Sequence, residues 1–188
     1  MTGPEFRTLA DVSYGTAEQV SPLVRRVVAE NPSKFTYLGT GTYIVGHGDV
    51  VVIDPGPTLD THRDALAAAL AGERVRAILV THCHSDHSPL AAWLHDETGA
   101  PTIAFGPHPR PDPATEPVEP LDDDVQIEES TDYDFRPDVY AGDGDIVVDG
   151  GGVTMTAVHT PGHTSNPTCF ALAEEGALFT GDHVMGWS

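Results

Sequence analysis

The chain has 188 residues, 39% of them hydrophobic, which suits one globular domain with a sizeable core. Nine Lys and Arg stand against 29 Asp and Glu, and the formal net charge of −20 argues against non-specific binding of polyanions. We find no apolar run near the roughly 18 residues that a membrane helix needs, and no signal peptide. Cys83 and Cys169 make no disulfide framework. We therefore expect a cytoplasmic protein without a membrane partner.

The first half of the chain predicts strands alternating with helices. Residues 35–45 and 50–54 are rich in β-branched and aromatic residues and are separated by a glycine turn, which predicts two strands. A helix follows, with Thr58 or Asp60 as its cap and Gly72 at its end. Residues 76–80 predict the next strand.

The second half predicts another helix and then mainly hairpins. Ser88 suits a helix N-cap, Pro89 the first helical position and Gly99 the C-terminal end. Residues 106–138 are rich in proline and acid, which predicts a long surface loop that could cover an active site. Strands and helices alternate in the first half of the chain and hairpins dominate the second half. This order favours a layered α/β or α+β fold. The other predicted strands are residues 101–105, 145–148, 153–158, 169–173 and 177–180.

A cluster of possible metal ligands directly follows the strand at residues 76–80. Side chains alternate along an extended chain, so His82 and His84 point to one side and Cys83 points to the other. The chain then turns, which lets Asp86 and His87 face a neighbouring point. Imidazole and carboxylate suit zinc, and also iron or manganese. We therefore predict that this cluster binds metal.

Two later loops supply further ligand types at strand ends. His163 stands on a Pro-Gly turn in "VHTPGHTS", and Asp182 stands next to glycine in "FTGDHVMG". Loops that follow strands can converge at one edge of a sheet, with the sheet as a rigid scaffold.

For the cysteine beside the cluster and for most of the other histidines, we expect roles other than metal binding. Cys83 faces away from the predicted metals, so we expect it to pack behind the loop and not to act as a nucleophile. His159 lies close to the site and is expected to be structural, whereas His183 could reach the substrate or the metals. We expect His47 to be exposed, His62 and His95 to be surface or packing residues, and His108 to lie in the proline-rich loop.

In this order, "THCHSDH", "TPGHT" and "GDH" resemble the metallo-β-lactamase superfamily, from about Val20 to the C-terminus. The resemblance implies an α+β fold, an αββα sandwich with two metals, usually zinc, at one edge. It implies that Asp54 orients the ligand loop from behind. It assigns His82, His84 and His163 to the first metal, Asp86 and His87 to the second, and Asp182 to both.

A narrower resemblance is to the group of β-lactamase-like protein 2, which includes single-strand endoribonucleases. It is carried by "PLVRRVVAENP", "GTGTYIVG", "VHTPGHTSN" and "GDHVMGWS". Gly41 replaces the usual Asn of that group, and Pro167 replaces the usual His. The family also takes a last histidine from a strand beyond the bridging aspartate, and nothing follows Ser188. We therefore expect residues 1–188 to form an incomplete domain that lacks C-terminal strands and helices.

By this resemblance the chain is a metal-dependent hydrolase of an ester, thioester or phosphodiester. A hydroxide bridging metals about 3.5–4 Å apart would be the nucleophile. Asp86 would orient it, and Asp182 would set the metal separation. The substrate would be a small molecule or a single-stranded nucleic acid. Among these activities, the resemblance favours an endoribonuclease-like one. A glyoxalase II-like thioesterase and a non-catalytic metal-binding fragment are the alternatives. We expect an unpaired strand edge to favour self-association.

Overall fold

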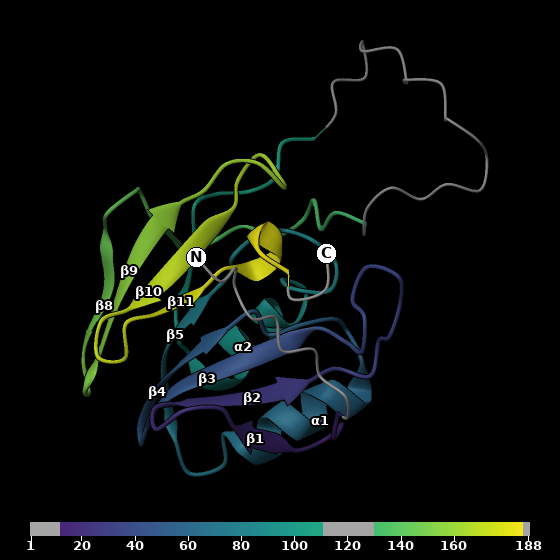
Figure 1. Cartoon of the computed structure of the whole chain (residues 1–188), viewed down its shortest axis with the longest axis vertical. Coiled ribbons are helices and arrows are strands. Elements are labelled where there is room, and N and C mark those ends of the chain that lie inside the picture. Colours follow the sequence, from purple (N-terminus) through teal and green to yellow (C-terminus); the bar gives the residue numbers. More distant parts are fainter. Residues whose placement is uncertain (1–11, 111–129, 186–188) are drawn as a thin grey trace, which may run out of the picture.

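A computed structural model describes residues 12–110 and 130–185, and its larger sheet has seven strands in chain order. The first four strands pair antiparallel (Figure 1). Strands β4 to β7 pair in parallel. Their bounds are β1 (Ala17–Gln19), β2 (Val24–Val28), β3 (Gly41–His47), β4 (Asp49–Ile53), β5 (Arg74–Leu79), β6 (Thr102–Ala104) and β7 (Val139–Tyr140).

Two helices cover one face of the larger sheet. Helix α1 (Asp60–Ala69) links β4 to β5, and α2 (Leu90–Thr98) links β5 to β6, so each forms a crossover between parallel strands. Leu66 on α1 and Leu94 on α2 are almost fully buried against Ile44 and Ile78 of the sheet. Helix α2 ends at Gly99, which has a left-handed φ of 69°.

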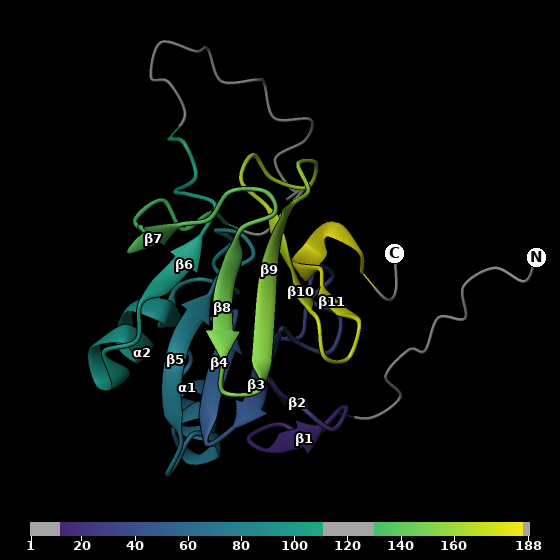
Figure 2. The same cartoon turned by 90° about the vertical axis from the view of Figure 1, so that its left-hand side faces the viewer.

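A four-stranded antiparallel sheet, β8 to β11, lies against the other face of the larger sheet (Figure 2). Phe170 and Met155 of the small sheet are fully buried in the core between the sheets, with Leu79 of the larger one. The described residues therefore stack as helices, large sheet and small sheet, which confirms the predicted α+β class. The strands are β8 (Ile146–Gly150), β9 (Val153–His159), β10 (Thr168–Leu172) and β11 (Ala177–Phe179).

The structure corrects several predicted boundaries. Residues 35–40 are not part of a strand, because their side chains and backbone form a polar loop before β3. No side chain caps α1, whose N-cap position is Leu59. Ser88 does not cap α2, since its hydroxyl bonds Asp132. The sequence does not predict strands β1, β2 and β7, which the structure shows.

The described part of the proline-rich segment is held by hydrogen bonds and packing contacts. Residues 111–129 lie outside the described residues, so the predicted lid is untested. Near its C-terminal end, Ser130 accepts a backbone hydrogen bond from Ser85 at 2.7 Å, and Phe135 is buried in the helix-side core. This part of the segment therefore packs beside the histidine cluster. None of the described helices is long and apolar enough to cross a membrane.

Candidate metal centre

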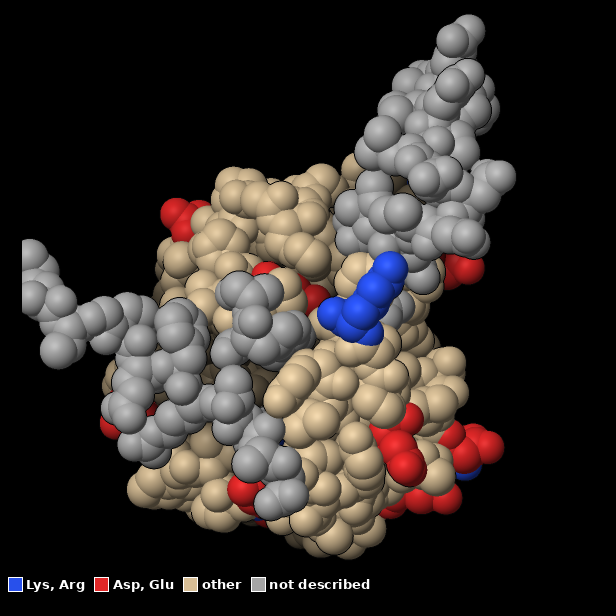
Figure 3. Space-filling view, turned by 45° about the vertical axis from the view of Figure 1, so that its right-hand side comes forward, with Lys and Arg blue, Asp and Glu red and all other residues tan. Residues whose placement is uncertain are grey.

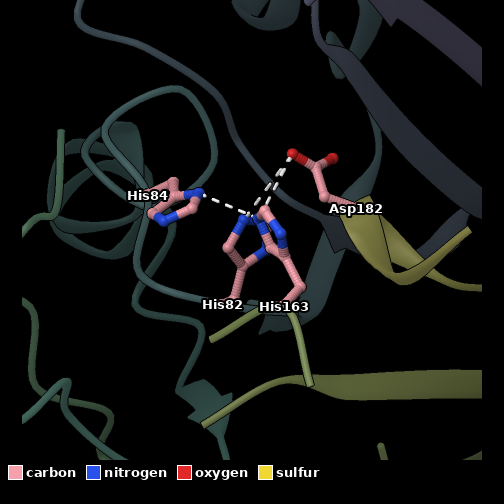
Figure 4. A group of neighbouring side chains, drawn as sticks. All are labelled: His82, His84, His163 and Asp182. Atoms are coloured by element: carbon pink, nitrogen blue, oxygen red, sulfur yellow. Dashed lines mark hydrogen bonds and ion pairs between the residues drawn. The ribbon is translucent and has the colours of Figure 1, made fainter. Parts of the chain in front are cut away.

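Four side chains converge where β5, β9 and β11 end. His82, His84, His163 and Asp182 each offer a ligand atom, and these atoms lie within 4.8 Å of one another. Figure 4 shows the three rings and the carboxylate pointing toward a common centre. Such a group could hold a metal ion, as the motif order predicts.

Backbone alternation after β5 sets the first part of this geometry. The rings of His82 and His84 lie 4.6 Å apart between centroids, while the intervening Cys83 is buried in the core beneath the helices. Burial raises the pKa of the Cys83 thiol, and Asn166 donates a hydrogen bond to its sulfur at 3.1 Å. The prediction that Cys83 packs behind the loop is confirmed, and its raised pKa disfavours the thiolate.

Asp86 and His87 form a second group next to the first. His87 Nε2 lies 3.2 Å from Asp86 Oδ2 and 3.3 Å from Asp182 Oδ1. The other oxygen of Asp182, Oδ2, lies 3.7 Å from His163 Nε2 and 3.9 Å from His82 Nε2. Asp182 thus directs one oxygen toward each group. The structure brings together all six residues that the sequence predicts as ligands.

Asp54, at the end of β4, supports both groups from behind. Its Oδ2 accepts hydrogen bonds from Thr81 Oγ1 at 2.7 Å and His87 Nδ1 at 2.9 Å, and its Oδ1 accepts from the Thr81 amide at 2.7 Å. Asp54 has a left-handed φ of 50°. Aspartate tolerates this region better than most residues, and strain of this kind is concentrated at functional sites.

The hydrogen-bond directions leave ligand atoms free. The single hydroxyl proton of Thr81 goes to Asp54, so His82 Nδ1 donates to Thr81 Oγ1 at 3.0 Å and the His82 Nε2 lone pair faces the site. Among the described residues, His82 Nε2 and Asp86 Oδ1 are buried without a hydrogen-bond partner. Buried polar atoms without a partner cost free energy. These atoms and this donor set therefore fit divalent metal ions.

Electrostatics at the site also favour a bound cation. Burial and the neighbouring histidines hold the pKa of His82 well below its usual value, so its ring is a neutral ligand. Burial would raise the pKa of Asp86, but the charge of His87 and its hydrogen bonds bring it to about 2. Burial would lower the pKa of His87, but the carboxylates around it raise it well above normal. The carboxylates are thus ionised and attract positive charge.

The loop before β3 holds Asp86 from the opposite side. Thr40 Oγ1 donates to Asp86 Oδ2 at 2.5 Å and accepts from Asn31 Nδ2 at 3.1 Å. The Asn31 side chain in turn accepts from the Thr40 amide at 2.9 Å. Sequence reasoning missed this support, because Asn31 and Asp86 are far apart in the chain and nothing in their local pattern links them.

The other histidines discussed from the sequence lie outside the group of candidate ligands. His159 stacks on Phe105 with ring centroids 3.9 Å apart, and its amide donates to Asp143, in line with a structural role. His183 is exposed and stands outside the described ligand group. His47 is exposed as predicted. His62, in contrast, is 2% exposed and so is a packing residue and not a surface one.

A cavity of about 780 Å³ opens beside Asp86 and Asp182 and runs between the sheets. Its walls include the apolar side chains of Tyr43, Ile53 and Phe179. Figure 3 shows acidic side chains scattered over one face, many of them near its edges, and a basic group near its middle, while most of the described surface there is neither acidic nor basic. The cavity provides apolar space next to the ligand group.

The family model that describes the metallo-β-lactamase superfamily matches residues 37–186. The chain belongs to this superfamily. A metallo-β-lactamase-type domain accounts for the two stacked sheets and for ligands gathered at the ends of strands.

Two curated relatives carry descriptions as a lactamase-like protein and as a thioesterase. Lactamase-like protein ptaB of Pestalotiopsis fici is 33% identical over 172 residues, with 90% of this chain and 47% of the relative covered. Atrochrysone carboxyl ACP thioesterase AgnL7 of Paecilomyces divaricatus is 37% identical over 173 residues, with the same coverage. The chain spans about half the length of the curated relatives it matches.

A solved structure agrees with the metallo-β-lactamase fold. The β-lactamase domain protein from Burkholderia ambifaria has a TM-score of 0.64 at 21% identity, covering 94% of this chain and 57% of that one. This likeness supports the fold alone.

Proposed function

We propose that this chain carries the site of a metal-dependent hydrolase that cleaves acyl thioesters. The observation that carries the proposal is the placement of Asp182 between two ligand groups, beside a buried Asp86 oxygen without a partner. The thioester is favoured because curated relatives are named carboxyl ACP thioesterases. The apolar cavity next to the ligands suits an acyl group.

Two divalent ions, most often zinc in sites of this type, fit the donor set. In the proposal, His82, His84 and His163 would hold one ion and Asp86 and His87 would hold the other, with Asp182 available to both groups. When bound, such ions lower the pKa of water toward about 7 and polarise a carbonyl oxygen. Asp54 keeps the rings of His87 and, through Thr81, His82 in their binding orientation.

The chain's own residues orient the reaction. Asp86 accepts a hydrogen bond from the attacking water and orients it as the water loses its proton, while Thr40 fixes the carboxylate. The water oxygen adds to the thioester carbonyl carbon, the C–S bond breaks, and the sulfur receives the proton. The products are a carboxylic acid and a thiol, so atoms and charge balance.

The sequence first suggested an endoribonuclease-like activity, and the phosphodiester substrate remains the main alternative. Its support is weaker because only nine Lys and Arg are present in a chain of charge −20, which disfavours a polyanionic substrate. We also propose a cytoplasmic location, which the free, buried cysteines Cys83 and Cys169 support.

The test offers the zinc-loaded chain an acyl N-acetylcysteamine thioester, bis-p-nitrophenyl phosphate and a single-stranded RNA. We expect thiol release from the thioester, and a loss of about 10²–10⁴-fold in rate for Asp86→Asn at equal zinc content. Cleavage of RNA or phosphodiester without thioester hydrolysis would assign the chain to the nuclease alternative. Bound zinc without hydrolysis of any substrate would identify a non-catalytic metal-binding fragment.

A further inference from the structure

His62 is a buried histidine that the proposed reaction does not use. It lies in the first turn of α1, is 2% exposed, and reaches beneath the turn that follows β4. Its Nε2 lies 2.9 Å from Thr42 Oγ1 on β3. Its ring also lies so close to Gly56 that a Cβ added there would be 2.7 Å from Nε2. His62 therefore packs directly against the turn at residues 54–56.

The hydrogen-bond directions fix how His62 acts. Thr42 Oγ1 lies 2.6 Å from the carbonyl oxygen of Asp54, which can only accept, so the single hydroxyl proton goes there. Thr42 must then accept from His62, which makes His62 the Nε2–H tautomer. Among the described residues, its Nδ1 is buried without a hydrogen-bond partner. A neutral ring in this tautomer is the form that completes the chain of bonds.

The turn at residues 54–56 is connected to the candidate metal ligands in several ways. The side chain of Asp54 bonds Thr81 and His87, as described above, and the Gly56 amide donates to the His87 carbonyl at 2.9 Å. The Gly56 carbonyl accepts from the Leu90 amide at 3.1 Å. Asp54 holds an unfavourable left-handed φ, which persists only where its surroundings determine it.

We propose that His62 is a positioning residue for the metal centre. By donating to Thr42 and packing on Gly56, it holds the backbone of the turn. The Asp54 carboxylate is then placed to accept hydrogen bonds from Thr81 and His87. These bonds keep the His87 ring directly, and the His82 ring through Thr81, in the orientation that faces the metal site. The proposal concerns metal binding alone and does not depend on the substrate.

The first test measures zinc affinity by competition with a chromophoric chelator. His62→Leu removes the donor at similar volume, and His62→Gln places an amide N–H near the position of Nε2. We expect about tenfold weaker zinc binding or more in His62→Leu, and affinity near the parent's in His62→Gln. His47→Gln changes an exposed histidine and should leave affinity unchanged. Equal zinc affinity in the parent and His62→Leu, or no recovery in His62→Gln, would overturn the proposal.

A second pair of variants covers the case in which His62→Leu does not fold. Thr42→Val removes the hydroxyl at nearly constant volume, whereas Thr42→Ser keeps it. We expect Thr42→Val to bind zinc about tenfold more weakly and Thr42→Ser to resemble the parent. A drop in melting temperature with unchanged zinc affinity would show a merely structural role and would contradict the proposal. Nitrogen-15 NMR of the imidazoles adds a direct readout, since an Nδ1–H tautomer at His62 would also refute it.

Discussion

Gly181 shows how closely a single residue is packed against the ligand support. It precedes Asp182 and has a left-handed φ of 49°. A Cβ added there would lie 2.5 Å from Thr81 Oγ1, a separation that real Cβ atoms do not show. Only glycine therefore lets Asp182 approach while Thr81 keeps its bonds to Asp54 and His82.

We predict that Gly181→Ala lowers zinc affinity about 10–100-fold, because Thr81 or Asp182 must move. The matched control is Gly176→Ala in the turn between β10 and β11, which has a φ of 58° but open space around the added Cβ. Both variants carry similar backbone strain, but only one disturbs the ligands. Equal zinc affinities for the two variants, measured by chelator competition, would show that the contact with Thr81 is unimportant.

A second residue-scale prediction concerns pH and His62. Burial lowers the pKa of His62 from 6.5 to about 4, although the Pro55 carbonyl acts in the other direction. The unfolded chain therefore takes up a proton at this residue between about pH 6.5 and 4, and the folded chain does not. Stability falls as the pH drops through this window, by up to about 3 kcal/mol.

Urea unfolding of the zinc-free protein at several pH values checks this sign. The difference in unfolding free energy between the parent and His62→Gln isolates the contribution of His62 from that of His87. We expect the parent to lose stability relative to His62→Gln as the pH falls from 6.5 to 4. A constant difference across this range would mean that the fold does not lower the pKa of His62.

At the scale of elements, β11 is an edge of the small sheet in the part of the chain that the structure describes. Its middle residue, Leu178, is 52% exposed, and Val184 nearby is 60% exposed. Unpaired backbone groups on an edge strand, combined with apolar side chains, favour pairing with another chain. We propose that a second copy of this chain pairs along β11.

We predict concentration-dependent self-association of the chain, seen by light scattering after size exclusion. Leu178→Lys places a charge on the β11 edge and should shift the protein toward the monomer. Ile146→Lys makes the same change on the opposite edge, β8, and should leave association unchanged. A parent that stays monomeric at every concentration would contradict the proposal, as would equal effects of the two variants.

The sequence predicted those elements whose pattern is local. The strands before Asp54 and after Ala100, both helices and the two late hairpins have apolar runs bounded by glycine or proline, and the structure places them within a few residues. The error at residues 35–40 arose because β-branched and aromatic residues there serve a hydrogen-bonded loop. Strand β1 has three exposed residues, so it carries no apolar pattern to detect.

The grouping of the candidate ligands was predictable, but Asp54 was the only one of their supports that the sequence indicated. His82, His84, Asp86 and His87 stand within six residues, and backbone alternation alone places two of the rings together. Thr40 and His62 act through contacts between segments distant in sequence. A threonine or a helical histidine carries no pattern that reports such a contact before the fold brings it about.

At the scale of the whole molecule, two sheets of unequal width meet along one core. The seven-stranded sheet faces a four-stranded one, and the cavity beside the ligand group lies between them, next to β2, β3 and β11. The ligands come from turns after β5, β9 and β11, and their support comes from the turn after β4. Rigid strands therefore fix the site, as expected for a preorganised metal centre.

The zinc content of the protein decides whether these turns form a metal centre. Elemental analysis after dialysis should find about one zinc ion or more per parent chain, and far less in His84→Ala, which loses one of the three histidine ligands. His95→Ala, on the exposed side of α2, should retain the parent's content. The same zinc content in His84→Ala as in the parent would contradict the proposed metal centre.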